Sequence, residues 1–355
     1  MQPHHTTEPQ GASPELPLIS VAALRSDDPA AQQQVADALG QAAQTYGFFR
    51  ISDHGISRAL IEETYHQAAR FFTLPEAQKR LYYIGDSTNH RGYVPFSEKG
   101  DYADEVNRSY EAFDLGVDLP KDDPDYLAGN RLLGPNVWPI LSGFKPVVAQ
   151  YYHEISTLGR LITSALEMHL GLPKGAMSSQ MDKPISQLRL LHYVRKSQRV
   201  DHASVNMGAH TDYECLTLLH TRNPGLQVLA QDDSWIDVPV DHNVYVCNIG
   251  DMLEAWSNGI LKSTPHRVVN SSAERYSMPY FIAANHDALI EPFPQLVSEE
   301  RPAAYEPFKA GDHLERMLMR DFPYLRAAVA KAKLIGGVEE EIHNPFEHRF
   351  NKSTA

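Results

Sequence analysis

Apolar residues in the first half of the chain recur every three or four positions, as they do on one face of a helix. Asp28-Pro29 is typical of a helix start, and Gly47 is typical of a helix end. Gly, Pro, Asp and Asn are instead frequent over residues 84–135, which predicts a loop-rich stretch. The pattern as a whole predicts helices over residues 29–46, 58–72 and 144–169, a shorter helix from Pro75, and strands over 16–19 and 48–51.

From Ser186 onward the apolar residues follow a spacing of two, which is typical of β-strands. Turn residues such as Asn223-Pro224-Gly225 separate the segments that carry this pattern. Strands are predicted over residues 187–194, 214–220, 226–229, 235–240, 244–249, 266–270 and 278–283. This number of short strands predicts an antiparallel sandwich or jelly roll. With the helices, the predicted fold class is mixed α/β, of the α+β type.

The two patterns divide the chain into four predicted segments. Residues 1–16 are polar, lack the apolar core of a signal peptide and are expected to form a disordered tail. Residues 17–185 are expected to form a helical region with strand insertions, packed on the core. Residues 186–294 are the expected jelly-roll core, and residues 295–355 a helical C-terminal cover and tail.

Composition narrows the function classes. The chain has 355 residues and a formal net charge of −13, which argues against a nucleic-acid binder and against attraction to anionic lipid. No stretch approaches the roughly 20 apolar residues needed to cross a bilayer. Cys215 and Cys247 are the only cysteines and form no CxxC pair, so a disulfide framework is excluded and a cytoplasmic location is expected.

The stretch His210-Thr211-Asp212 is the first candidate for chemistry. A histidine and a carboxylate two residues apart would point to the same face of a β-strand. His266, farther along the chain, can complete a site of two imidazoles and one carboxylate. This ligand set leaves three positions open and suits non-haem Fe(II) that binds oxygen and an organic partner together.

A rival pair of the same spacing occurs at His313-Leu314-Glu315, and the chain has 17 histidines in all. The pattern around His313 is helical, and on a helix positions i and i+2 point about 200° apart. We therefore expect His313 and Glu315 to be solvated and to make a poor metal site.

Arg275 and Ser277 show the two-residue spacing again, beside the apolar stretch Met278-Pro279-Tyr280-Phe281. On one strand face they would offer a planar guanidinium group and a hydroxyl to a carboxylate. A carboxylate in an apolar pocket needs such partners. The spacing therefore predicts an acidic co-substrate next to the iron.

Several motifs, in this order along the chain, resemble one known family. They are Tyr46-Gly47-Phe48-Phe49, Asp53-His54-Gly55, Arg91-Gly92-Tyr93, residues 134–139, Leu190-Leu191-His192-Tyr193, His210-Thr211-Asp212, residues 225–228, Asn248-Ile249-Gly250-Asp251, residues 263–268 and Arg275-Tyr276-Ser277. The chain resembles the isopenicillin N synthase-like group of Fe(II)- and 2-oxoglutarate-dependent dioxygenases. The resemblance covers nearly all of the chain after residue 16.

The resemblance implies a double-stranded β-helix (jelly-roll) core flanked by helices. It implies that His210, Asp212 and His266 bind Fe(II). It also implies that Arg275, Ser277 and Tyr193 hold 2-oxoglutarate, although plant members often have Asn where this chain has Leu191. The implied activity is oxidation, most often hydroxylation, of a small molecule by O2, with release of succinate and CO2 and with ascorbate as a reductant.

The resemblance leaves the substrate open. Residues that fall where the family often builds its pocket are Arg91, Tyr93, Phe113, Phe281 and Asn285. We expect a monomer of secondary metabolism that binds a small molecule and neither nucleic acid nor membrane. Alternatives are an isopenicillin N synthase-type oxidase (ring closure or desaturation) without 2-oxoglutarate, an ethylene-forming variant, and a non-catalytic jelly-roll binding protein.

Overall fold

The computed structural model describes residues 15–96, 110–194, 205–269, 274–322, 324–325, 344 and 346. Most of the predicted tail over residues 1–16 therefore lies outside the described residues, although Leu16 is buried. Much of the predicted cover over residues 295–355 also lies outside them. The described part of that cover contains α7 (Ala310–Asp321), the short turn η5 (Pro294–Leu296) and the strand β14 (Phe308–Lys309).

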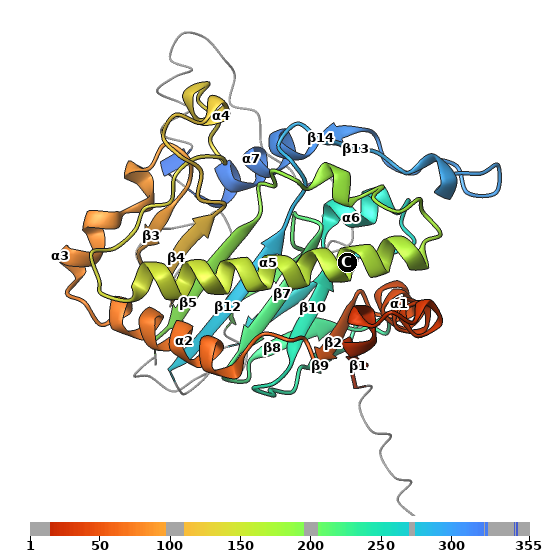
Figure 1. Ribbon diagram of the computed structural model, residues 1–355, viewed down its shortest axis with the longest axis horizontal. Coiled ribbons are helices and arrows are strands. Elements are labelled where there is room, and N and C mark those ends of the chain that lie inside the picture. The colour runs from red at the N-terminus through yellow and green to blue at the C-terminus, as the bar shows by residue number, and fades with distance from the viewer. Residues whose placement is uncertain are drawn as a thin grey trace, which may run out of the picture.

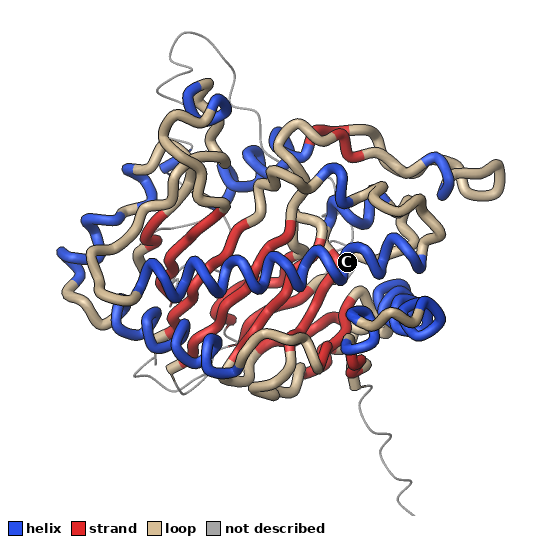
Figure 2. The backbone as a smooth tube through the Cα atoms, viewed as in Figure 1, coloured by secondary structure: helices blue, strands red, loops and turns tan. Residues whose placement is uncertain are grey.

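Two mainly antiparallel sheets form the centre of the molecule (Figures 1 and 2). The large sheet has the order β1 (Leu18–Ser20), β2 (Phe48–Ser52), β10 (Tyr245–Ile249), β7 (Leu216–Thr221), β12 (Arg275–Ile282), β5 (Gln187–Tyr193), β4 (Tyr110–Gly116), β3 (Gly92–Val94). Only its pair β1–β2 is parallel. The small sheet has the order β6 (Val205–His210), β11 (His266–Val269), β8 (Leu226–Leu229), β9 (Trp235–Asp237). A further pair joins β13 (Leu289–Ile290) to β14.

The two sheets face each other across one pocket, because residues of β6, β8 and β11 line it together with residues of β5, β7 and β12. This is the sandwich that the spacing of two predicted. Each of the seven predicted segments contains a strand. The same spacing did not predict β6, and it did not predict the short helix α6 (Asp251–Trp256) that follows β10.

Three long helices cover the outer face of the large sheet, and α5 runs across its strands (Figure 1). They are α1 (Pro29–Thr45), α2 (Arg58–Phe72) and α5 (Phe144–His169), as predicted. Asp28 caps α1, since its Oδ1 accepts the N–H groups of Ala30 and Ala31 at 2.9 and 3.2 Å. The shorter helices are α3 (Glu76–Lys79) and α4 (Pro124–Leu127), with 3-10 turns at Ala22–Arg25, Arg80–Tyr82, Ile84–Asp86 and Ser178–Gln180.

The helices also bear on the membrane question. Within the described residues, no helix is both long and apolar enough to cross a lipid bilayer.

The prediction of a loop-rich stretch over residues 84–135 was wrong for β4, which is buried along its whole length. That prediction rested on the frequent Gly, Pro, Asp and Asn of the stretch. In the structure, tertiary partners neutralise the buried Glu111 and Asp114 of β4. Glu111 accepts from Lys79 Nζ at 2.5 Å, and Asp114 accepts from Arg189 Nε and Nη2 at 2.7 and 2.8 Å. Buried charges are tolerated when they are paired in this way.

The strands β1 to β4 all come from the predicted N-terminal region, yet they extend the large sheet at both edges. That region therefore does more than pack on the core. The division of the chain at residues 185 and 186 stays a prediction.

Burial of His220 on β7 makes the stability of the fold sensitive to acid. Its Nε2 donates to the carbonyl of His242 at 3.2 Å, and its Nδ1 lies 2.8 Å from the hydroxyl of Tyr65 on α2. Burial lowers the pKa of His220 to about 4, from an ordinary value of 6.5. Between these values the unfolded chain binds a proton that the folded protein excludes, so stability falls as the pH drops.

We expect the substitution His220→Gln to reduce this acid sensitivity. Between pH 7 and pH 4.5, wild-type protein should lose roughly 2–3 kcal/mol more unfolding free energy than the variant, as follows from the lowered pKa. Urea unfolding of both proteins at the two pH values measures the difference. The exposed His153, changed to Gln, is the control, and equal pH slopes for His220→Gln and wild type would contradict the assignment.

Candidate metal centre and its pocket

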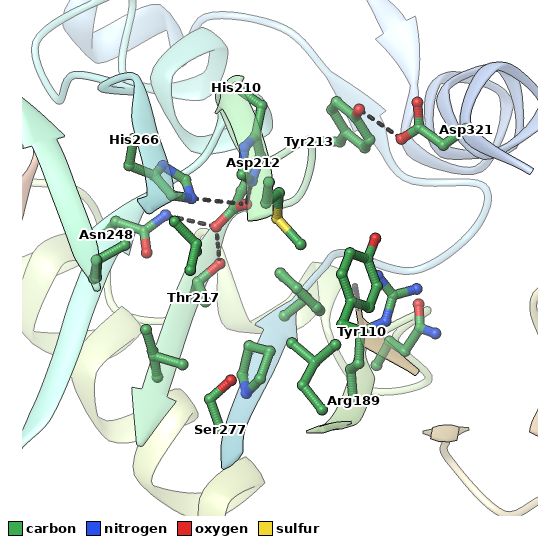
Figure 3. A pocket seen from close by; sticks show the side chains of 18 of the residues that line it. Tyr110, Arg189, His210, Asp212, Tyr213, Thr217, Asn248, His266, Ser277 and Asp321 are labelled. Carbon is green, nitrogen blue, oxygen red and sulfur yellow. Dashed lines mark hydrogen bonds and ion pairs between the residues drawn. The ribbon is translucent and has the colours of Figure 1, made fainter. Parts of the chain in front are cut away.

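Three side chains predicted to bind a metal converge at one end of the pocket (Figure 3). His210 is the last residue of β6, and it pairs in register with His266, the first residue of β11. Asp212 lies in the loop that follows β6. The expectation that His210 and Asp212 share one strand face was therefore wrong, because the strand ends at His210. Strand pairing and the loop bring the three side chains together.

Backbone carbonyls orient both imidazoles. His210 Nδ1 lies 2.8 Å from the carbonyl of Gly208, and His266 Nδ1 lies 3.3 Å from that of Thr264. An Nδ1–H that donates to a carbonyl leaves Nε2 free to bind a metal. The two Nε2 atoms lie 3.8 and 3.6 Å from Asp212 Oδ1, and the three candidate ligand atoms all lie within 4.8 Å of one another, so they could share one metal ion.

Asp212 is held from behind by two residues that the sequence analysis did not assign to the site. Its Oδ2 accepts from the hydroxyl of Thr217 and, at 2.6 Å, from Nδ2 of Asn248 (Figure 3). These bonds turn Oδ1 toward the imidazoles. The sequence held one signal for the role of Thr217: it is the lone polar residue in the apolar run of residues 216–219. In the structure it lies on the strand face that lines the pocket.

The protonation states suit metal binding. Burial and the neighbouring His210 lower the pKa of His266 to about 4, so this imidazole is neutral at pH 7. Burial alone would raise the pKa of Asp212, but the two histidines and the bonds from Thr217 and Asn248 outweigh it and keep the pKa below its ordinary value. Next to them, burial and the charge of Asp212 raise the pKa of Glu214 to about 8.

Arg275 and Ser277 lie on β12 and face the same pocket, as predicted. Both are 1% exposed, and Arg275 Nη1 lies 3.5 Å from Ser277 Oγ. The guanidinium carbon of Arg275 lies 4.7 Å from the ring centre of Tyr193. Among the described residues, no carboxylate forms an ion pair with Arg275. A buried cation without a counter-charge is costly, so this end of the pocket suits an anionic ligand.

The pocket between these two ends encloses about 1080 Å³ of empty space, part of it open to solvent. Of the predicted substrate contacts, Phe281 lines it. Apolar side chains predominate in the wall of the pocket, and they include Leu191, Leu219, Leu226, Val268, Pro279 and Phe281. Polar residues of the wall, apart from the metal ligands and the residues around Arg275, include Tyr110, Gln187, Arg189, Tyr213, Glu214 and Asp321.

The other four predicted substrate contacts do not line the pocket. The guanidinium of Arg91 is buried and donates to the carbonyls of His90 and Leu132 at 2.9 and 2.7 Å, so its role is structural. Tyr93 and Phe113 pack in an aromatic cluster around Phe71. These residues are core rather than pocket.

Asn285 also lies elsewhere. Its side chain bonds the backbone N–H of Lys183 at 2.9 Å and the carboxylate of Asp182, in a loop outside the pocket. The predictions for Arg91, Tyr93, Phe113 and Asn285 rested on where the family often builds its pocket. A matching place in the sequence does not decide whether a side chain of this protein faces the pocket, the core or a loop.

The rival pair at His313 and Glu315 lies on α7, as the helical pattern predicted. His313 is only 6% exposed, so the expectation of a solvated pair was wrong for this residue. Glu315 instead lies 3.2 Å from His286. Within the part of the chain that the structure describes, His210, Asp212 and His266 are the one cluster of His, Cys, Asp or Glu side chains able to share a metal ion.

Two family models match the chain in sequence. Residues 16–140 match the model described as non-haem dioxygenase in morphine synthesis N-terminal, and residues 185–284 match the 2OG-Fe(II) oxygenase superfamily. The chain belongs to this superfamily of oxygenases. Fe(II) and 2-oxoglutarate are therefore its metal and co-substrate, and the chain is an Fe(II)- and 2-oxoglutarate-dependent dioxygenase.

Relatives along nearly the whole chain agree. Kihadalactone A synthase LFS from Citrus sinensis is 33% identical over 312 residues, which cover 84% of this chain and 92% of the relative. Homoarginine-6-hydroxylase 2-ODD-233 from Oryza sativa subsp. japonica is 32% identical and covers 86% of this chain and 97% of its own.

Solved structures confirm the jelly-roll fold with flanking helices. The structure of Neurospora crassa T7H in complex with alpha-KG has a TM-score of 0.75 and 28% identity, covering 89% of this chain and 96% of that one. A 2OG-Fe(II) oxygenase family protein from Caulobacter crescentus has a TM-score of 0.76 and 31% identity, covering 86% and 98%. Two imidazoles and one carboxylate on one side of a pocket fit the Fe(II) that this superfamily uses.

We expect the substitution Thr217→Val to weaken Fe(II) binding. It removes one bond to Asp212 Oδ2 while keeping the side-chain shape, and loss of a residue that supports a metal ligand typically costs about 10–100-fold in affinity. Anaerobic titration with Fe(II) measures the change. Thr157→Val on the exposed side of α5 is the control, and an unchanged affinity in Thr217→Val would show that this bond does not orient Asp212.

Proposed function

We propose that this dioxygenase hydroxylates a small molecule and converts 2-oxoglutarate into succinate and CO2. The proposed iron ligands are His210, Asp212 and His266, and the proposed 2-oxoglutarate site is Arg275, Ser277 and Tyr193. The observation that carries the proposal is the buried Arg275, which has no carboxylate partner among the described residues and faces the pocket that the ligand cluster lines. O2 as the oxidant and ascorbate as a reductant belong to the proposal.

When bound, Fe(II) and 2-oxoglutarate would activate O2 for the oxidation of a C–H bond. The protein's part is to position and shield. The guanidinium of Arg275 and the hydroxyl of Ser277 would hold the carboxylate of 2-oxoglutarate that points away from the iron. The ring of Tyr193 lies against the guanidinium and restricts its position. Leu219, Pro279 and the other apolar residues of the wall limit access of water between the two sites.

Relatives support a small-molecule substrate. The Neurospora crassa T7H structures include complexes with thymine and with 5-formyluracil. The net charge of −13 agrees with a substrate other than nucleic acid. We further propose that the protein is a monomer and that it is cytoplasmic. The free, buried Cys215 and Cys247 agree with a cytoplasmic location.

The test combines two measurements on the purified protein. Anaerobic titration should show one Fe(II) bound per chain, and succinate should form only when 2-oxoglutarate, Fe(II) and O2 are all present. Iron-dependent oxidation of a substrate without 2-oxoglutarate would instead support an isopenicillin N synthase-type oxidase. Ethylene detected by gas analysis would support the ethylene-forming variant. Absence of stoichiometric Fe(II) binding would leave the non-catalytic binding protein.

A further inference from the structure

A buried carboxamide faces the pocket without a partner. Gln187, the first residue of β5, is 5% exposed and lines the pocket, and its Nε2 is fully buried without a hydrogen bond. No bond to its Oε1 occurs within the described residues either. Leaving a buried amide unpaired destabilises a protein, so the free Nε2 of Gln187 suggests a group that donates its hydrogen bond to a ligand.

The register of the large sheet places Gln187 relative to the metal. Asn248 pairs with Thr217, Thr217 with Phe281, and Phe281 with Gln187, on the four adjacent strands β10, β7, β12 and β5. All four residues line the pocket. Thr217 and Asn248 hold Asp212, so the row begins at the metal ligands and ends at Gln187. Strands lie about 4.8 Å apart, which puts the backbone of Gln187 roughly 10 Å from that of Thr217.

Near Gln187, the cationic side chain of the pocket wall is already paired. Arg189, two residues after Gln187 on β5, lies across the pocket from the metal ligands (Figure 3). Its Nε and Nη2 both donate to the carboxylate of Asp114, at 2.7 and 2.8 Å. Glu214 adds a further carboxyl group to the wall. An anionic substrate would therefore find no unpaired cation here among the described residues, whereas a neutral oxygen atom would find the amide of Gln187.

We propose that the carboxamide of Gln187 selects the substrate by donating a hydrogen bond to a neutral carbonyl or hydroxyl oxygen. The apolar body of the substrate lies along Phe281, between that oxygen and the iron. The inference rests on the proposed function, because it assigns the substrate class of the same pocket. It predicts neutral ring compounds that carry an oxygen at the end away from the oxidised carbon.

The variant Gln187→Met tests whether the amide has a partner inside the protein. Methionine keeps the length of the side chain and removes both hydrogen-bonding atoms. Because the amide is unpaired in the free protein, we expect the thermal midpoint to stay unchanged or to rise by about 1–4 °C. A clear fall in the midpoint would show an internal partner and overturn the inference. Gln33→Met, on the exposed surface of α1, is the control.

Binding of matched probe compounds tests whether Gln187 selects substrates that carry a neutral oxygen. The probes are 1-indanone and 1-tetralone, their deoxy analogues indane and tetralin, and the anion indane-1-carboxylate. Calorimetry without O2, with Fe(II) and 2-oxoglutarate present, should show each ketone binding wild-type protein roughly 5- to 100-fold more tightly than its deoxy analogue. Gln187→Met should lose most of this difference, Gln33→Met should keep it, and the carboxylate should bind more weakly than the ketones.

Several results would overturn the inference. They are equal affinities within each pair in wild-type protein, a ketone preference that survives in Gln187→Met, tightest binding of the carboxylate, and no binding of any ketone. Succinate formation by wild-type protein separates this failure from failure of the proposed function. If 2-oxoglutarate is consumed but the preference does not depend on Gln187, only the assignment of Gln187 fails. If 2-oxoglutarate is not consumed, the proposed function fails whatever the probes show.

Discussion

Replacement of His210 by alanine is expected to abolish turnover and leave the protein folded. The imidazole supplies one of three candidate ligand atoms, and its removal leaves one nitrogen and one carboxylate oxygen. We expect succinate formation to fall roughly a thousandfold or more, beyond the 10–100-fold typical of residues that only support a ligand. Fe(II) affinity, measured by anaerobic titration, should fall in parallel.

The side chain of His210 is 16% exposed at the end of a strand, so the thermal midpoint of the metal-free variant should stay close to that of wild type. The exposed His153 on α5, changed to alanine, is the matched control and should leave iron binding and turnover unchanged. Undiminished turnover in His210→Ala would refute its assignment as a ligand.

Replacement of Arg275 by leucine should weaken 2-oxoglutarate binding by roughly a hundredfold or more, since removing one partner of a buried charge pair costs about 2–5 kcal/mol. The same change should not destabilise the ligand-free protein, because it removes a buried cation that has no counter-charge among the described residues. A loss of 2-oxoglutarate binding without a loss of stability distinguishes a ligand-binding arginine from a structural one.

Calorimetric titration with 2-oxoglutarate measures the first effect, and thermal unfolding measures the second. Arg275→Lys keeps the charge but not the planar pair of donors, and it should bind with intermediate affinity. The exposed Arg160 on α5, changed to leucine, is the control. Unaltered 2-oxoglutarate affinity in Arg275→Leu would place the co-substrate elsewhere.

The metal centre shows which site residues the spacing of the sequence can predict and which it cannot explain. The sequence predicted the residues His210, Asp212 and His266, and the structure brings all three together. The reason given for the first pair was nevertheless wrong, because β6 ends at His210 and Asp212 lies beyond it. The end of a strand depends on its pairing with β11, and this long-range contact leaves no periodic signal. For Arg275 and Ser277 the strand continues, and the shared face was predicted correctly.

Buried charges also limited the prediction of strands from the sequence. β4 lies in the stretch where frequent Gly, Pro, Asp and Asn predicted a loop. Its Glu111 and Asp114 are nevertheless buried, and a carboxylate is rarely buried unless it is paired. Their partners Lys79 and Arg189 come from other segments of the chain. Local sequence cannot show that such a partner will be present.

The sequence by itself determined the helices, most of the strands, the class of fold, the iron and co-substrate chemistry and the residues expected to carry it. These features follow from local periodicity and from motifs of a few residues. Only the tertiary structure decided which buried residues face the pocket. It placed Arg91 and Phe113 in the core, and it left the amide of Gln187 unpaired beside the substrate space. Burial is encoded in periodicity, whereas the neighbour that a buried side chain meets depends on which strands pair.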